Sequence, residues 1–95
     1  MIDIDYETLE DELVSGAFAA RLEIELTRGF RAISASGERL PTASHYASQI
    51  AEIVNRGAAE PLSADLAYNL YQEILLACER ARAAVLGEEG LSPRA

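Results

Sequence analysis

The chain has 95 residues, a mass of 10.3 kDa and a formal net charge of −8 at pH 7. Apolar residues make up 49% of the sequence, which excludes an intrinsically disordered chain, and the length corresponds to one domain. Nucleic acids and anionic membranes are bound through basic patches, so the excess of carboxylates argues against both as partners. A basic protein partner is compatible with this charge.

The cysteine and histidine content narrows the classes of site further. Cys78 is the only cysteine and His45 the only histidine, so we expect no internal disulfide, no zinc cluster and no metal or cofactor. The amino terminus is acidic and lacks the basic start of a signal peptide, and no apolar run approaches the ~18 residues of a membrane span. We therefore expect a cytoplasmic protein. All eight cations are arginine, which a GC-rich bacterial genome explains.

The segment 5–36 has the apolar periodicity of one long helix with two apolar faces. One face carries Leu9, Leu13, Ala17, Ala20 and Ile24, and the other carries Phe18, Leu22, Leu26, Phe30 and Ile33. A surface helix of a small monomer needs only one apolar stripe. A helix of this length would also extend over roughly 45 Å, beyond a compact domain of this size. Two stripes need cover on both sides, so we expect a second subunit to supply part of that cover, in a homodimer.

A β-hairpin is the competing interpretation of the middle of this segment. Leu22, Ile24 and Leu26 alternate with charged residues, and residues 27–29 could form the turn. Gly29 would also cost a helix about 1 kcal/mol relative to alanine. The helix is favoured because the apolar series at i, i+4 continues past Gly29 to Phe30.

Two further helices follow, separated by short loops. The first is expected from Thr42 to Arg56, capped by Thr42 or Ser44 and ended by Gly57. The second begins at the Ser63 cap and ends near Leu86, with Gly87 as its C-terminal cap. Residues 88–95 are expected to be a loose polar tail on a single domain, 1–87. The predicted fold is all-α, with a long, a short and a medium helix in antiparallel order.

No phosphate-binding glycine loop, nucleophile elbow, cysteine pair or HExxH motif is present. The candidates for chemistry are therefore the arginines. Arg21 and Arg28 lie one heptad apart with Arg31 within one turn of them, and Arg82 lies at the edge of the last helix's apolar stripe with Cys78. Such arginines either pair with glutamates at the edge of the core or form a pocket for a small dianion.

His45 points away from the apolar face of its helix, so we interpret it as a solvated surface residue. Its surroundings, HYASQ, lack the small residues that a phosphotransfer histidine needs.

The helix order and lengths resemble the all-helical class of chorismate mutase, over roughly Leu9 to Arg82. The similar stretches are ELVSGAFAARLEIEL, GERLPTASHYASQIAEIV and PLSADLAYNLYQEILLACERAR. The resemblance implies an entwined dimer in which two protomers share their long first helices and each site is lined by both chains. It also implies a site that binds the small dicarboxylate chorismate without a cofactor.

The resemblance assigns roles to individual residues. The family's arginine in the middle of the first helix corresponds to Arg21, and its later lysine falls near Ala32, next to Arg31. The family's early arginine falls near Ile4, where this chain has no cation. Under the resemblance Arg21 and Arg82 are the catalytic candidates, and the substrate-binding candidates are Arg28, Arg31, Ser48, Glu52 and Cys78.

Two functions are therefore carried forward. The first is a divergent chorismate-mutase-like protein, active as an isomerase or a related pyruvate lyase, or no longer active, with an arginine-lined pocket. The second is a non-catalytic acidic helical module of the adaptor, antitoxin or immunity type that covers a basic partner. The outward acids that favour the second are Glu7, Glu10, Asp11, Glu12, Glu23, Glu25, Glu73 and Glu79.

Overall fold

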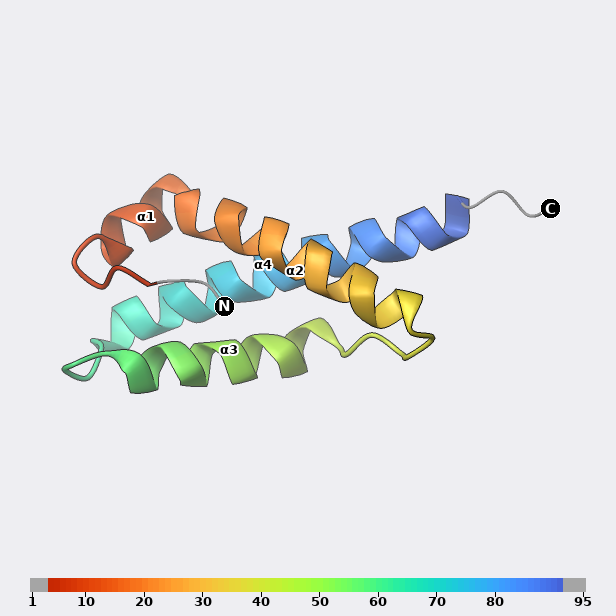
Figure 1. Cartoon of the computed structure of the whole chain (residues 1–95). Helices are drawn as coiled ribbons and strands as arrows, with labels where there is room; N and C mark the ends of the chain where they lie inside the picture. Colours follow the sequence, from red (N-terminus) through yellow and green to blue (C-terminus); the bar gives the residue numbers. More distant parts are fainter. Residues whose placement is uncertain (1–3, 92–95) are drawn as a thin grey trace.

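The computed structural model describes residues 4–91 of the chain. This part is all-α and contains no strand; its four helices are α1 (Leu9–Ser15), α2 (Ala17–Ala35), α3 (Ala43–Gly57) and α4 (Ala64–Leu91). Helices α2 and α4 run in the same direction and α3 runs back between their ends, with α1 beside the start of α2 (Figure 1). The bundle is elongated, with extents of 53 × 23 × 19 Å. None of the helices in these residues combines the length and apolar character needed to cross a membrane.

The first helix is broken at Gly16, so the prediction of one continuous helix, and with it of three helices, is wrong. Gly16 has φ +83, in the left-handed region that residues with a Cβ adopt only at a cost. Its N–H donates to the Leu13 carbonyl at 3.4 Å, and its carbonyl accepts from the Ala20 N–H at 3.0 Å. Gly16 therefore ends α1 and begins α2.

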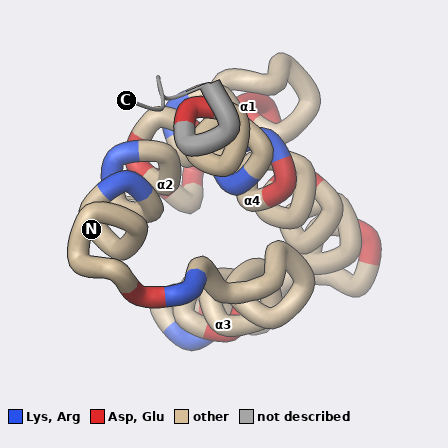
Figure 2. The backbone as a smooth tube through the Cα atoms, turned by 90° about the vertical axis from the view of Figure 1, so that its right-hand side faces the viewer, with Lys and Arg blue, Asp and Glu red and all other residues tan. Residues whose placement is uncertain are grey.

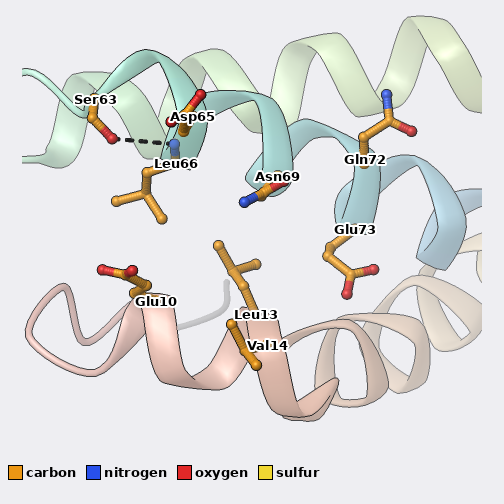
Figure 3. A pocket seen from close by; sticks show the side chains of 9 residues that line it. All are labelled: Glu10, Leu13, Val14, Ser63, Asp65, Leu66, Asn69, Gln72 and Glu73. Carbon is orange, nitrogen blue, oxygen red and sulfur yellow. Dashed lines mark hydrogen bonds between the residues drawn. The ribbon is translucent and has the colours of Figure 1, made fainter.

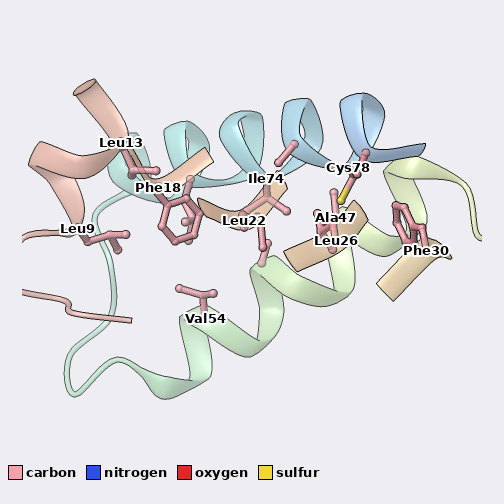
Figure 4. Close-up of a cluster of buried hydrophobic side chains, with 14 of the residues drawn as sticks. Leu9, Leu13, Phe18, Leu22, Leu26, Phe30, Ala47, Val54, Ile74 and Cys78 are labelled. Carbon is pink, nitrogen blue, oxygen red and sulfur yellow. The ribbon is translucent and has the colours of Figure 1, made fainter. Parts of the chain in front are cut away.

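The break brings Leu9 and Leu13 of the first predicted face to the same core as the second face. Leu9 and Leu13 are only 1% and 5% exposed, and they pack with Phe18 and Leu22 of α2 (Figure 4). Burying one leucine contributes roughly 1.5–3 kcal/mol, whereas a lost helical hydrogen bond costs about 1 kcal/mol. The gain from two leucines therefore offsets the interruption. The α2 members of the first face, Ala17, Ala20 and Ile24, stay at the surface, and Ile24 is 59% exposed.

The helix through Gly29 is confirmed, and the hairpin alternative is wrong, because α2 continues to Ala35. The predicted start of α3 is also confirmed: the Thr42 side chain accepts from the His45 N–H at 3.4 Å. Likewise, the Ser63 hydroxyl accepts from the Leu66 N–H at 3.2 Å at the start of α4.

The predicted end of the last helix at Gly87 is wrong. Gly87 does not adopt a positive φ, and α4 continues to Leu91. Glu88, in the first turn beyond the expected end, forms a salt bridge with Arg31 of α2. Of the predicted tail, residues 88–91 are thus helical and residues 92–95 lie outside the described part.

Helix α4 is the element on which α2 and α3 pack. Its fully buried residues face both α2 and α3, whereas no Cα of α2 lies within 8 Å of a Cα of α3. Figure 2 shows the three helices around this shared core from one end. Side chains of α2 and α3 still meet: the rings of Phe30 and Tyr46 contact edge to face, with their centroids 5.3 Å apart. Near the other end of α3, the Tyr6 hydroxyl donates to the Val54 carbonyl at 2.6 Å.

Substitution by alanine should change the stability of the protein in opposite directions at Gly16, between α1 and α2, and at Gly29, within α2. A Cβ on Gly29 meets nothing within 4 Å, and its backbone is helical, so Gly29→Ala should stabilise the protein by about 0.4–1 kcal/mol. Gly16 also has open space, but its φ of +83 is strained for alanine, so Gly16→Ala should destabilise by about 1–2 kcal/mol. Urea unfolding of both variants measures this. A destabilised Gly29→Ala, or a stabilised Gly16→Ala, would contradict these two conformations.

Candidate functional site

A hollow of about 480 Å³ lies between α1 and the first half of α4 (Figure 3). Leu13 and Leu66 form its apolar floor, and the carboxylates that line it are Glu10, Asp65 and Glu73. Glu10 and Leu13 point from α1 toward α4, and Glu73 points from α4 toward α1. No arginine lines this hollow. The site therefore combines an apolar base with negative charge.

The turn at Gly16 makes this hollow. It sets α1 beside α4, so that Leu13 is buried while its neighbour Val14 stands 85% exposed at the rim. Asp65 lies in the first turn of α4, where a carboxylate also favours the positive end of the helix. No arginine forms a salt bridge with Glu10 or Glu73 in the described residues. These two carboxylates are therefore available to a ligand.

Arg21 and Arg82, the catalytic candidates, belong to separate contacts. The Arg21 guanidinium forms a salt bridge with Glu12 of α1 and is half exposed. Arg82 of α4 is partly buried, and its Nε donates to the Pro41 carbonyl at 3.1 Å, in the loop before α3. Neither side chain lines the α1/α4 hollow or the two other hollows between helices. The described structure does not bring these two arginines into one pocket.

Arg28 and Arg31 are also engaged by glutamates. Arg28 lies 3.6 Å from the Glu25 carboxylate, one turn earlier on α2. The Arg31 Nε donates to the Glu88 carboxylate of α4 at 2.8 Å. This hydrogen bond lowers the pKa of Glu88 and raises the pKa of Arg31. Both pairs are exposed to solvent, so each contributes little to stability.

Ser48 and Glu52 are the two candidates that the structure brings into one hollow, a shallow one of about 510 Å³ between α3 and α4. Tyr71 of α4 also lines it. The Ser48 hydroxyl donates to the Ser44 carbonyl at 3.0 Å, and Glu52 forms a salt bridge with Arg56 at 2.5 Å. Both polar groups are thus already engaged within α3.

Cys78 lies in the core rather than at a surface. Its side chain is fully buried against α2 and α3, and this burial, with a smaller effect of Glu79, raises the pKa of the thiol to about 11. The prediction that His45 is a surface residue is confirmed, with Gln49 as its neighbour at 3.3 Å. Among the described side chains, those of residues 4–88, no three His, Cys, Asp or Glu lie close enough to hold a metal ion.

The sequence interpretation named Glu10 and Glu73 only as outward acids and did not place them in one hollow. Their spacing along the chain carries no motif, because they come from different helices. The available signal was Gly16, which follows the seven residues of α1 and could have marked a helix end.

The raised pKa of Cys78 predicts a loss of stability in alkaline solution. In the unfolded chain the thiol has a pKa of about 8.5, so between that pH and 11 the unfolded state loses a proton that the folded state keeps. Stability should therefore fall as pH rises through this window, and more steeply for the wild type than for Cys78→Ala. Urea unfolding of the two proteins at a series of pH values, from neutral to the top of this window, measures how steeply the free energy of unfolding falls with pH in each. Equal slopes would show that the thiol ionises as readily in the folded protein.

Comparison with known proteins identifies no relative of this chain. The chain matches no protein-family model, no curated protein and no solved structure. The features that bear on function are therefore the hollow between α1 and α4, the groups with which the arginines interact and the distribution of charge.

Proposed function

We propose that the chain is a non-catalytic acidic helical module that binds a basic segment of a partner protein in the hollow between α1 and α4. One observation carries this proposal: the hollow joins an apolar floor to carboxylates that no arginine of the described chain neutralises. The other acids suggested for this role are partly used internally, since Glu12, Glu23 and Glu25 are paired with arginines.

A lysine or arginine side chain of the partner fits this hollow chemically. Its aliphatic stem would pack on Leu13 and Leu66, and its cationic head would pair with Glu10 or with Glu73, which lie on either side of Leu13 (Figure 3). Val14, exposed at the rim, offers a further apolar contact to the partner. The net charge of −8 would also steer a basic partner and speed its association.

The charge distribution also favours binding of a basic partner at the α1 end of the molecule. Glu7, Glu10 and Asp11 lie on or just before α1, and none of them forms a salt bridge in the described residues. The arginines Arg28 and Arg31 belong to the second half of α2, which runs away from α1 (Figure 1). A basic partner would therefore meet unpaired acids at the α1 end and a mixture of charges at the other.

Binding of a basic amphipathic peptide tests this function. The probe is a fluorescein-labelled peptide with lysine and leucine at helical spacing, titrated by anisotropy. Wild type should bind it, and Glu73→Lys should weaken binding roughly ten- to hundred-fold, because a charged hydrogen-bonding partner contributes about 1.5–3 kcal/mol.

Glu79→Lys is the matched control for this titration. It makes the same change of charge on the same helix, at an exposed acid outside the hollow. It should reduce affinity much less than Glu73→Lys. Equal losses in the two variants would mean that the peptide reads only the net charge, and the hollow would lose its role.

A chorismate-mutase-like function is a second proposal, and one observation favours it. Arg82 is partly buried and makes one hydrogen bond, to the Pro41 carbonyl, but pairs with no carboxylate of the described chain. Its guanidinium could bind a carboxylate of a small dianion such as chorismate, with Arg21 supplied after release from Glu12 or by a second copy. This proposal keeps the all-α architecture and the homodimer that the resemblance implies.

Calorimetric titration with a bicyclic dicarboxylate that mimics the chair-shaped transition state distinguishes the two functions. The mutase-like proposal predicts binding by wild type and a roughly ten- to hundred-fold loss in Arg82→Ala. The binding-module proposal predicts no saturation at millimolar ligand. Melting curves of Arg21→Ala supply the control, since loss of its pair with Glu12 should loosen α1 whether or not a ligand binds.

A further inference from the structure

A second surface feature is independent of the acidic hollow: an apolar groove of about 340 Å³ between α2 and α3. Phe18, Leu22 and Leu26 of α2 line one side, and Ile50 and Ile53 of α3 line the other. Glu25 is the one charged residue of its lining. The groove exists because α2 and α3 pack on α4 and not directly on each other.

Ile53 distinguishes this groove from ordinary packing. Phe18, at the bottom, is almost fully buried, whereas Ile53 at the edge is 54% exposed. An isoleucine at the edge of an open apolar groove is both part of a receptor surface and a side chain that could fill one. This combination is self-complementary, as the interface of a two-fold symmetric dimer has to be.

The charges beside the groove favour a second copy of the chain as its occupant. Arg21, Glu25 and Arg28 follow one another at i, i+4 and i+7, so they share one face of α2, on which Glu25 lines the groove. In an antiparallel pairing of two α2 helices about an axis between residues 25 and 28, Glu25 of each copy faces Arg28 of the other. The exposed pair of Glu25 and Arg28 within each chain, 3.6 Å apart, would then join a cluster of four alternating charges. Elsewhere, at the α1 end, two copies would bring unpaired acids together.

We propose that the α2/α3 groove is a homodimer interface, with Ile53 of each copy inserted into the groove of the other. This arrangement differs from the entwined dimer expected from the sequence. In the folded protomer the face of α2 left for an entwined partner is the exposed one that carries Ile24. The interface proposed here instead uses the side of α2 that borders the groove, together with α3. It does not depend on the proposed binding of a basic segment, because the two surfaces share no lining residue.

Light scattering behind a sizing column tests the interface on the full chain. At high micromolar concentration the wild type should elute with about twice the 10.3 kDa chain mass. Ile53→Asp should elute as a monomer, while Ile24→Asp should remain a dimer. The two isoleucines are 54% and 59% exposed, so neither change empties the core, and melting curves check that both variants fold.

A charge exchange tests the register of the interface. Glu25→Arg and Arg28→Glu should each weaken the dimer several-fold, because each places like charges opposite one another twice in a symmetric dimer. The double variant, Glu25→Arg with Arg28→Glu, should restore wild-type affinity. A monomeric wild type, or a dimer unaffected by Ile53→Asp, would overturn the proposal. A dimer broken by Ile24→Asp alone would indicate the entwined arrangement instead.

Discussion

The left-handed turn at Gly16 is the constraint on which the rest of the structure depends. It converts a helix with two apolar faces into two helices that share one core, because Leu9 and Leu13 turn inward with α1. The same turn places Glu12 against Arg21 and sets Glu10 opposite α4. A local backbone preference of one glycine thus decides the packing of the N-terminal quarter, the engagement of one candidate arginine and the shape of the acidic hollow.

Much of the fold could be predicted because the relevant signals are local. Apolar periodicity indicated helices, and Thr42 and Ser63 marked two helix starts through caps that need only their own neighbours. The glycines were harder, because Gly16, Gly29 and Gly87 carry a similar intrinsic cost in a helix. Only at Gly16 does a break allow two leucines to reach the core, and that gain depends on the position of α4, which local sequence does not encode.

The candidate site was less accessible to sequence reasoning, since its contacts join distant segments. Arg31 meets Glu88, 57 residues away, and Arg82 meets Pro41, 41 residues away. The sequence left open whether arginines at the edge of the core pair with glutamates, and Arg21, Arg28 and Arg31 do so. Which of the sixteen carboxylates each one pairs with could not be chosen without the fold. The hollow between α1 and α4 depends further on the direction of α1, and so on the break.

The position of α4 has a consequence for how the molecule opens. Because α2 and α3 have their main interfaces with α4 and meet each other only through a few side chains, either one can detach while the other keeps its interface. Detachment of α4 would remove both interfaces at once. Backbone amides of α4 should therefore exchange with solvent only through global unfolding, whereas those of α1, a seven-residue helix at the end of the bundle, should exchange through local fluctuations. Cooperativity in this bundle is thus concentrated in its last helix, and a chain completes its fold only after that helix has been made.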